Sequence, residues 1–188
     1  MKLTSLILLM FTIEAGVLRA QTANPPVNAD SAIVQDFQKR VTEYLKFRKN
    51  VESNLPKLKP TESQEKIVHH EKELARAIRA ARSDARQGDI FTPQIADEIR
   101  RLIGMALHPP RDGKHIKESL RHAEPVQLHL YINETYPAHT PRQSTPPSIL
   151  ANLPALPPEL EYRITGRDLV LLDSKANLIV DLISGVFS

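Results

Sequence analysis

The sequence contains no cysteine and no tryptophan, and only 6 of its 188 residues are glycine. Without cysteine the chain forms no disulfide, no thiolate-ligated zinc or iron–sulfur site and no thiol nucleophile. Its few glycines build no Gly-rich phosphate-binding loop, and the Gly-x-Ser-x-Gly motif of many hydrolases is absent. Aromatic residues make up 5% of the chain, so we expect an aliphatic core.

Other residue types are abundant. Hydrophobic residues make up 41% of the chain and charged residues 25%, which is typical of a globular protein and not of a disordered one. The length predicts one domain, or one domain with a tail. Of the 15 prolines, seven lie between Pro137 and Pro158. Because proline cannot donate to a sheet, this stretch is predicted to run as extended chain over the surface.

The first residues have the pattern of a secretory signal. A positive start at Lys2 is followed by an apolar run over residues 3–13, which Glu14 ends. As a helix this run spans about 16 Å, roughly half the hydrocarbon core of a membrane. We therefore predict a signal peptide over residues 1–20, cleaved after Ala20, and a periplasmic or secreted protein. The alternative is a buried N-terminal helix of a cytosolic protein.

After a flexible segment over residues 21–29, the chain is predicted to be helical over residues 30–123. The first helix begins at Asp30 or Ser31, and its apolar residues recur at steps of three and four to about residue 52. Pro56 then ends it, because proline has no N–H to donate.

A second helix is predicted to begin at Thr61. The spacing between Thr61 and Gln64 is that of a capping box, in which each of the two side chains accepts a terminal backbone N–H. Gly88 is the predicted end of this helix. Because the first two helices are long and joined by a short loop, we expect them to pack as an antiparallel hairpin.

A third helix has the clearest start in the chain. Thr92 is the predicted N-cap, and Pro93 occupies the first helical position, where its missing N–H costs nothing. The adjacent prolines Pro109 and Pro110 end the helix. A short fourth helix is predicted over residues 114–123.

The last third of the chain is predicted to contain strands. Apolar and polar residues alternate over residues 126–133, which indicates a half-buried strand within the strand and proline-rich segment at residues 124–160. That segment includes a short helix at residues 147–153. Residues 161–188 are predicted to form a three-stranded antiparallel β-meander, with Gly166 in a two-residue hairpin loop.

The middle strand of the meander is apolar on both faces, so one face must pack against the helices. The predicted fold class is therefore α+β, with an N-terminal helical hairpin, a third helix, a proline-rich connection and a C-terminal meander. Because the strands need the helices to bury that face, the two parts form one unit.

The basic charge lies in the helical part. Residues 21–122 contain 19 basic and 14 acidic side chains, whereas residues 123–188 contain 4 basic and 7 acidic ones. Five basic residues recur at steps of three and four and predict a surface for an anionic partner, such as an envelope polysaccharide or lipid headgroups. They are Lys72, Arg76, Arg79, Arg82 and Arg86. The alternative is a solvated helix face with side-chain pairs.

Histidines suggest a second kind of site. His115 and His122 lie two helical turns apart with Glu118 between them. Imidazole and carboxylate groups bind nickel, zinc or copper without sulfur, so these three residues are a candidate divalent-metal site. The alternative is that they are exposed on a polar helix. No other cofactor is predicted.

Two family resemblances accompany these patterns. Residues 157–183, with Tyr162-Arg163 before Gly166 and the run Ile179-Val180-Asp181, resemble the closing hairpin of small bacterial periplasmic proteins, some of the nickel/cobalt-homeostasis type. The helical part is similar to periplasmic chaperones of the Spy/CpxP kind, on residues 61–64 and 91–94. Both resemblances imply an exported binding protein, and neither transfers a catalytic or ligand residue.

Together these patterns predict an exported bacterial envelope protein with a non-catalytic binding or accessory role. Its expected partner is an anionic envelope component or another protein, and not a nucleic acid, because aromatic platforms for single strands are missing. The mature chain is expected to have no transmembrane segment. A metal-homeostasis protein and a hydrolase-type enzyme are the alternatives.

Overall fold

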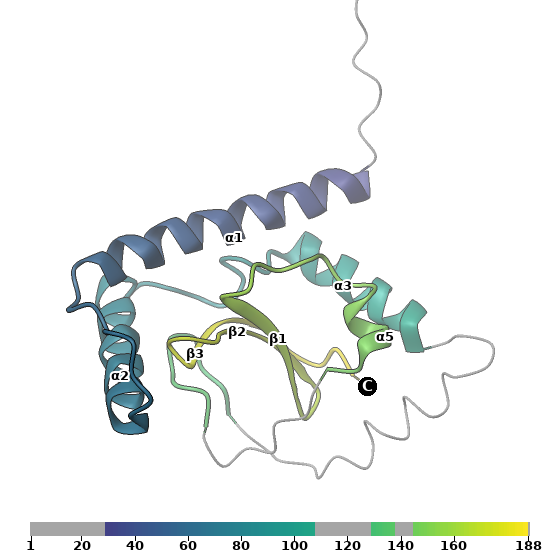
Figure 1. Ribbon diagram of the computed structural model, residues 1–188. Helices are drawn as coiled ribbons and strands as arrows, with labels where there is room; N and C mark the ends of the chain where they lie inside the picture. The colour runs from purple at the N-terminus through teal and green to yellow at the C-terminus, as the bar shows by residue number, and fades with distance from the viewer. Residues whose placement is uncertain (1–28, 108–128, 138–144, 188) are drawn as a thin grey trace, which may run out of the picture.

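The computed structural model describes residues 29–107, 129–137 and 145–187. Within them a three-stranded sheet lies against several helices (Figure 1), which confirms the predicted α+β class. The helices are α1 (Ala29–Ser53), α2 (Gln64–Ala81), α3 (Pro93–Leu107) and α5 (Pro147–Leu150), and the strands are β1 (Leu160–Thr165), β2 (Asp168–Asp173) and β3 (Leu178–Ile183). The predicted signal peptide, the helix at residues 114–123 and the proline pair after α3 lie outside the described residues.

The C-terminal meander forms as predicted. The strands are antiparallel in the order β1-β2-β3, and the β1–β2 hairpin closes with Thr165 opposite Asp168. Gly166 lies in the loop between them with φ +57°, a conformation that glycine adopts without steric cost. The local pattern of apolar runs and turn residues therefore determines these three strands.

A β-bulge in β3 changes which side chains face the helices. Leu171 of β2 pairs with Asp181, but the next residue of β2 pairs with Ile179, so Val180 is the extra residue of the bulge. Ile179 packs on the face away from the helices, whereas Val180 belongs to the core beneath them. Asp181 follows on the helix side, where it contacts the loop between α2 and α3. The bulge therefore places two consecutive residues on one face.

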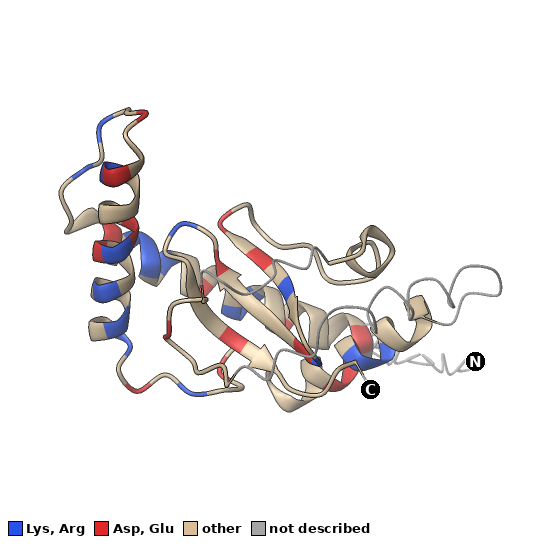
Figure 2. Ribbon diagram, turned by 90° about the horizontal axis from the view of Figure 1, so that it is seen from below, with Lys and Arg blue, Asp and Glu red and all other residues tan. Residues whose placement is uncertain are grey.

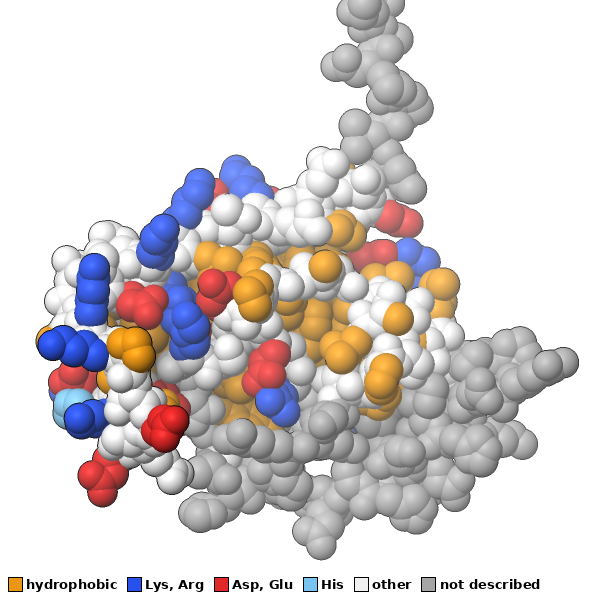
Figure 3. Space-filling model, in the orientation of Figure 1, with side chains coloured by type: hydrophobic (Ala, Val, Ile, Leu, Met, Phe, Trp, Pro, Cys, Tyr) orange, Lys and Arg blue, Asp and Glu red, His pale blue; other side chains and the backbone are white. Residues whose placement is uncertain are grey.

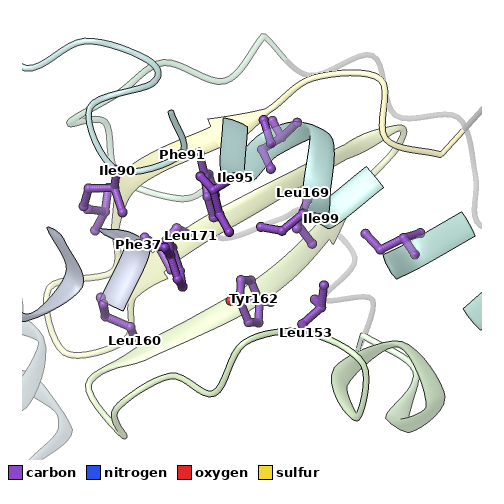
Figure 4. Packing of buried hydrophobic residues seen from close by; sticks show 14 of the residues in the cluster. Phe37, Ile90, Phe91, Ile95, Ile99, Leu153, Leu160, Tyr162, Leu169 and Leu171 are labelled. Carbon is purple, nitrogen blue, oxygen red and sulfur yellow. The ribbon is translucent and has the colours of Figure 1, made fainter. Parts of the chain in front are cut away.

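Helices α1, α3 and α5 cover one face of the sheet (Figures 1 and 4). Three aromatic rings from separate elements stack in this core. The centroids of Phe37 and Phe91 are 5.8 Å apart, and those of Phe91 and Tyr162 are 6.5 Å apart. The core is mostly aliphatic, as expected, but these aromatic residues converge in it instead of being distributed over the surface.

The other face of the sheet carries a smaller cluster. It consists of Tyr136, Val170, Leu172, Ile179 and Leu182, with Leu130 and Ile132 packed against it. Residues 129–133 do not form the predicted strand, because the chain turns at Asn133, which has φ +66°. Thr135 then makes an isolated bridge to Leu178 of β3. Backbone hydrogen bonds of Asn133, Glu134 and Tyr136 also join this segment to β3 and to the turn before it, while Leu130 and Ile132 pack onto the sheet.

Helix α2 begins at a different cap from the predicted one. The Ser63 hydroxyl accepts the backbone N–H of Lys66, which makes Ser63 the N-cap. The hydroxyl of Thr61 instead accepts the N–H of Ser63 at 3.2 Å. The predicted capping box between Thr61 and Gln64 is therefore wrong. Both hydroxyls could cap a helix, and the sequence pattern did not distinguish them.

The end of α2 also differs from the prediction. The helix ends at Ala81, well before Gly88, which lies in the following loop with φ +93°. The carbonyl oxygen of Arg82 accepts a bond of 2.6 Å from the side-chain amide of Asn133, a residue far along the chain. This contact with Asn133 satisfies a carbonyl group at the end of α2, and no local sequence pattern indicates it.

Helices α1 and α2 do not lie antiparallel along their length as predicted. Figure 1 shows α2 steeply inclined to α1, with the C-terminal end of α2 next to the C-terminal part of α1, where Arg82 contacts Tyr44. The cluster that joins them consists of Leu74, Ala75, Ile78, Ala176 and Leu178, with Phe47, Val51 and Leu55 packed against it. Earlier turns of α1 pack on the sheet core instead. The apolar face of α1 is therefore divided: its earlier turns pack on the sheet, and its last turns pack on α2.

Candidate functional site

Three of the predicted anion-binding residues lie on the outward side of α2. Leu74 and Ile78 are fully buried on the opposite side of this helix. Lys72, Arg76 and Arg79 are exposed, and their spacing of three and four residues aligns them. Figure 2 marks the basic positions along the ribbon of α2, and Figure 3 shows basic side chains at the end of the molecule that α2 forms.

Arg82 is engaged in structural contacts. Its two terminal nitrogens each donate to the carbonyl oxygen of Val180 at 3.3 Å, and Nη1 also donates to Asn133 Oδ1 at 3.1 Å. The guanidinium lies over the ring of Tyr44, 5.3 Å from its centroid, which is a cation–π contact. Arg82 therefore joins α2 to β3 and to α1, although the sequence pattern placed it with the partner-binding residues.

The remaining basic residues divide into two groups. Arg79 donates from Nη2 to the hydroxyl of Thr135 at 3.3 Å, so it is partly held by the fold. Within the described residues, no hydrogen bond or ion pair engages the exposed side chains of Lys72, Arg76 and Arg86. Lys72 and Arg76 lie on α2, and Arg86 lies in the loop that follows it; we call these three exposed residues the basic face. They are the members of the predicted set that remain available to a partner.

Asp181 holds the loop that carries Arg86. This carboxylate is fully buried, and it accepts four backbone N–H groups, two on each oxygen. Three of them come from Gly88, Ile90 and Phe91, at distances of 2.8 to 3.0 Å. Burial raises the pKa of Asp181, and the four N–H donors act in the opposite direction. One side chain therefore fixes the connection between α2 and α3.

A second buried acid joins α1 to the turn between β2 and β3. Asp173 is fully buried, and its Oδ2 lies 2.7 Å from Arg48 Nε and accepts the hydroxyl of Tyr44 at 2.9 Å. Its Oδ1 accepts the backbone N–H groups of Lys175 and Ala176, both at 3.0 Å. Burial and the neighbouring carboxylate raise the pKa of Tyr44. The Asp173 carboxylate thus binds both α1 and the turn between β2 and β3.

Arg48 is 4% exposed. Its Nε lies close enough to Asp173 for an ion pair, but the N–H group is not aligned for a hydrogen bond. Its Nη1 donates to Glu52 Oε2 at 3.1 Å, whereas Nη2 has no hydrogen-bond partner among the described residues. The sequence patterns did not single out Asp173 or Asp181 as buried acids. An acid inside the apolar run Leu178–Ile183 was the signal that Asp181 is buried.

The predicted metal site at His115, Glu118 and His122 lies outside the described residues. In the described part of the chain, no group of three histidine, aspartate or glutamate side chains is arranged to hold a metal ion. None of the helices in that part combines the length and apolar character needed to cross a membrane.

Comparison of the chain with protein-family models, with curated proteins and with solved structures finds no match. The site residues themselves are therefore the basis for inferring a function.

Proposed function

We propose that this protein is an exported bacterial envelope protein that acts by binding, and that it holds an anionic partner at the basic face. The observation that carries the proposal is the presence of three exposed cations, Lys72, Arg76 and Arg86, without partners among the described residues. Exposed charges that form no internal pair contribute little to the stability of the fold. They are available to attract a surface of opposite charge.

The anionic headgroups of a membrane are the partner that this proposal favours. Each lysine or arginine near an anionic lipid surface contributes about 1 kcal/mol to binding, and the contribution falls with salt. Export, proposed from the pattern of residues 1–20, would bring the protein to such surfaces. N-terminal sequencing of protein expressed in a bacterial host tests the export step, with Gln21 as the expected first residue.

Neutralising the basic face should weaken membrane binding. The variant Arg76→Gln/Arg86→Gln is expected to lose about 2 kcal/mol, roughly 30-fold in affinity, for vesicles that contain phosphatidylglycerol. Binding is measured by co-sedimentation at low salt and at about 0.15 M salt, where screening should reduce it. Vesicles of phosphatidylcholine alone provide the uncharged comparison.

Two variants serve as controls. Lys39→Gln/Arg100→Gln makes the same change in net charge at exposed residues outside the basic face, and its binding should stay within about twofold of the wild type. Arg82→Gln should lower the melting temperature, because it removes the bonds to Val180, while the folded protein still binds. Equal loss in Lys39→Gln/Arg100→Gln and in the basic-face variant would refute the proposal.

A further inference from the structure

A cleft of about 500 Å³ lies where α1, the loop before α2, α2 itself and the β2–β3 turn meet. Its lining residues are Lys49, Glu52, Ser53, Pro56, Lys57, Leu58, His70 and Lys175. Cavities of roughly 300–1,000 Å³ are the size range in which proteins bind small molecules. None of the basic-face residues lines this cleft, so it is a separate place on the molecule.

The charge of the cleft is positive. Lys49, Lys57 and Lys175 are exposed, and no ion pair engages their ammonium groups among the described residues. The one acidic lining residue, Glu52, is already paired with the buried guanidinium of Arg48 at 3.1 Å. Three like charges around one opening repel one another, and an anion between them would remove that repulsion.

Two walls of the cleft are held by the buried Asp173. This carboxylate accepts the backbone N–H of Lys175 and pairs with Arg48, which in turn holds Glu52. The turn that carries Lys175 and the α1 residues of the cleft are therefore fixed relative to each other before any ligand binds. A site whose walls are already in place loses less free energy in ordering its residues upon binding.

The chemistry of the lining indicates the ligand. Lysine ammonium groups act as point charges, and lysine is a common ligand of phosphate groups, whereas arginine favours planar, two-point pairing. Pro56 and Leu58 add an apolar part, and the Leu58 side chain is 40% exposed. We infer that the cleft binds a small organic anion with two negative charges, whose apolar body covers Leu58. A phosphate monoester and a dicarboxylate share this chemistry.

Titration calorimetry of the purified full chain tests this inference, with phenyl phosphate, phthalate and inorganic phosphate as probes. We expect saturable binding of phenyl phosphate or of phthalate, and the one that binds more tightly identifies the anionic group. Lys57→Gln/Lys175→Gln should weaken that binding by about tenfold or more, because it removes two charge-assisted contacts. Leu58→Ser should reduce the preference for phenyl phosphate or phthalate over inorganic phosphate.

The matched control is Lys39→Gln/Lys46→Gln, which removes two exposed charges of α1 outside the cleft. Its affinity should stay close to that of the wild type, as should that of Arg76→Gln/Arg86→Gln. The inference is overturned if neither organic probe binds saturably, or if the control weakens binding as much as the cleft variant does. Failure of vesicle binding at the basic face leaves this result unaffected, because the two sites share no residue.

Discussion

Replacing Asp181 with alanine is expected to lower the free energy of unfolding by about 4 kcal/mol or more. The change leaves four backbone N–H groups without an acceptor in or next to the core, and each unsatisfied donor costs about 1–3 kcal/mol. Since domains unfold with about 5–15 kcal/mol in total, this is a large share of the stability. Urea unfolding followed by circular dichroism measures it.

Asparagine should not rescue this position. Each oxygen of Asp181 accepts two N–H groups, and an amide nitrogen in place of one oxygen can accept neither. Asp168→Ala is the matched control, because this more exposed acid of β2 accepts one backbone N–H, from Gly185 at 2.9 Å. We expect the control to cost about 1 kcal/mol. An Asp181→Ala protein as stable as the control would contradict the role of Asp181 in holding the loop.

Replacing Arg48 with methionine should produce the second large loss of stability. Methionine has a similar length but leaves the charge of Asp173 buried without its cationic partner. Breaking a buried ion pair from one side typically costs about 3–5 kcal/mol. Arg100→Met is the control, because Arg100 pairs with Asp97 at an exposed position and should contribute less than about 1 kcal/mol.

A double-mutant cycle separates the ion pair from general packing loss. In Asp173→Asn the amide oxygen can still accept the N–H groups of Lys175 and Ala176, while the charge is removed. The double variant with Arg48→Met should therefore lose less stability than the sum of the single variants, by about 1–3 kcal/mol. Strict additivity in urea unfolding would show that Arg48 and Asp173 are not energetically coupled.

Local patterns in the chain were sufficient to predict much of the fold. The three strands follow from apolar runs separated by short turns, and α3 begins at Pro93 after Thr92 as expected. The middle strand is apolar on both faces, which required helices on one of them, and α1 and α3 lie there. These features depend on residues within a few positions of each other, where backbone preference and side-chain periodicity act directly.

Contacts between distant residues decided the rest. Asp181 meets Gly88, and Asp173 meets Arg48, across separations of 93 residues and more than 100 residues. Residue spacing indicated that Arg82 faces a partner, but Val180 and Asn133 take up its guanidinium. Periodicity reports which side of a helix a residue occupies, and not what the folded chain brings to that side. Only the tertiary structure therefore showed which of the five basic residues stay available to a partner. It also brought Lys49, Lys57 and Lys175 together around one cleft.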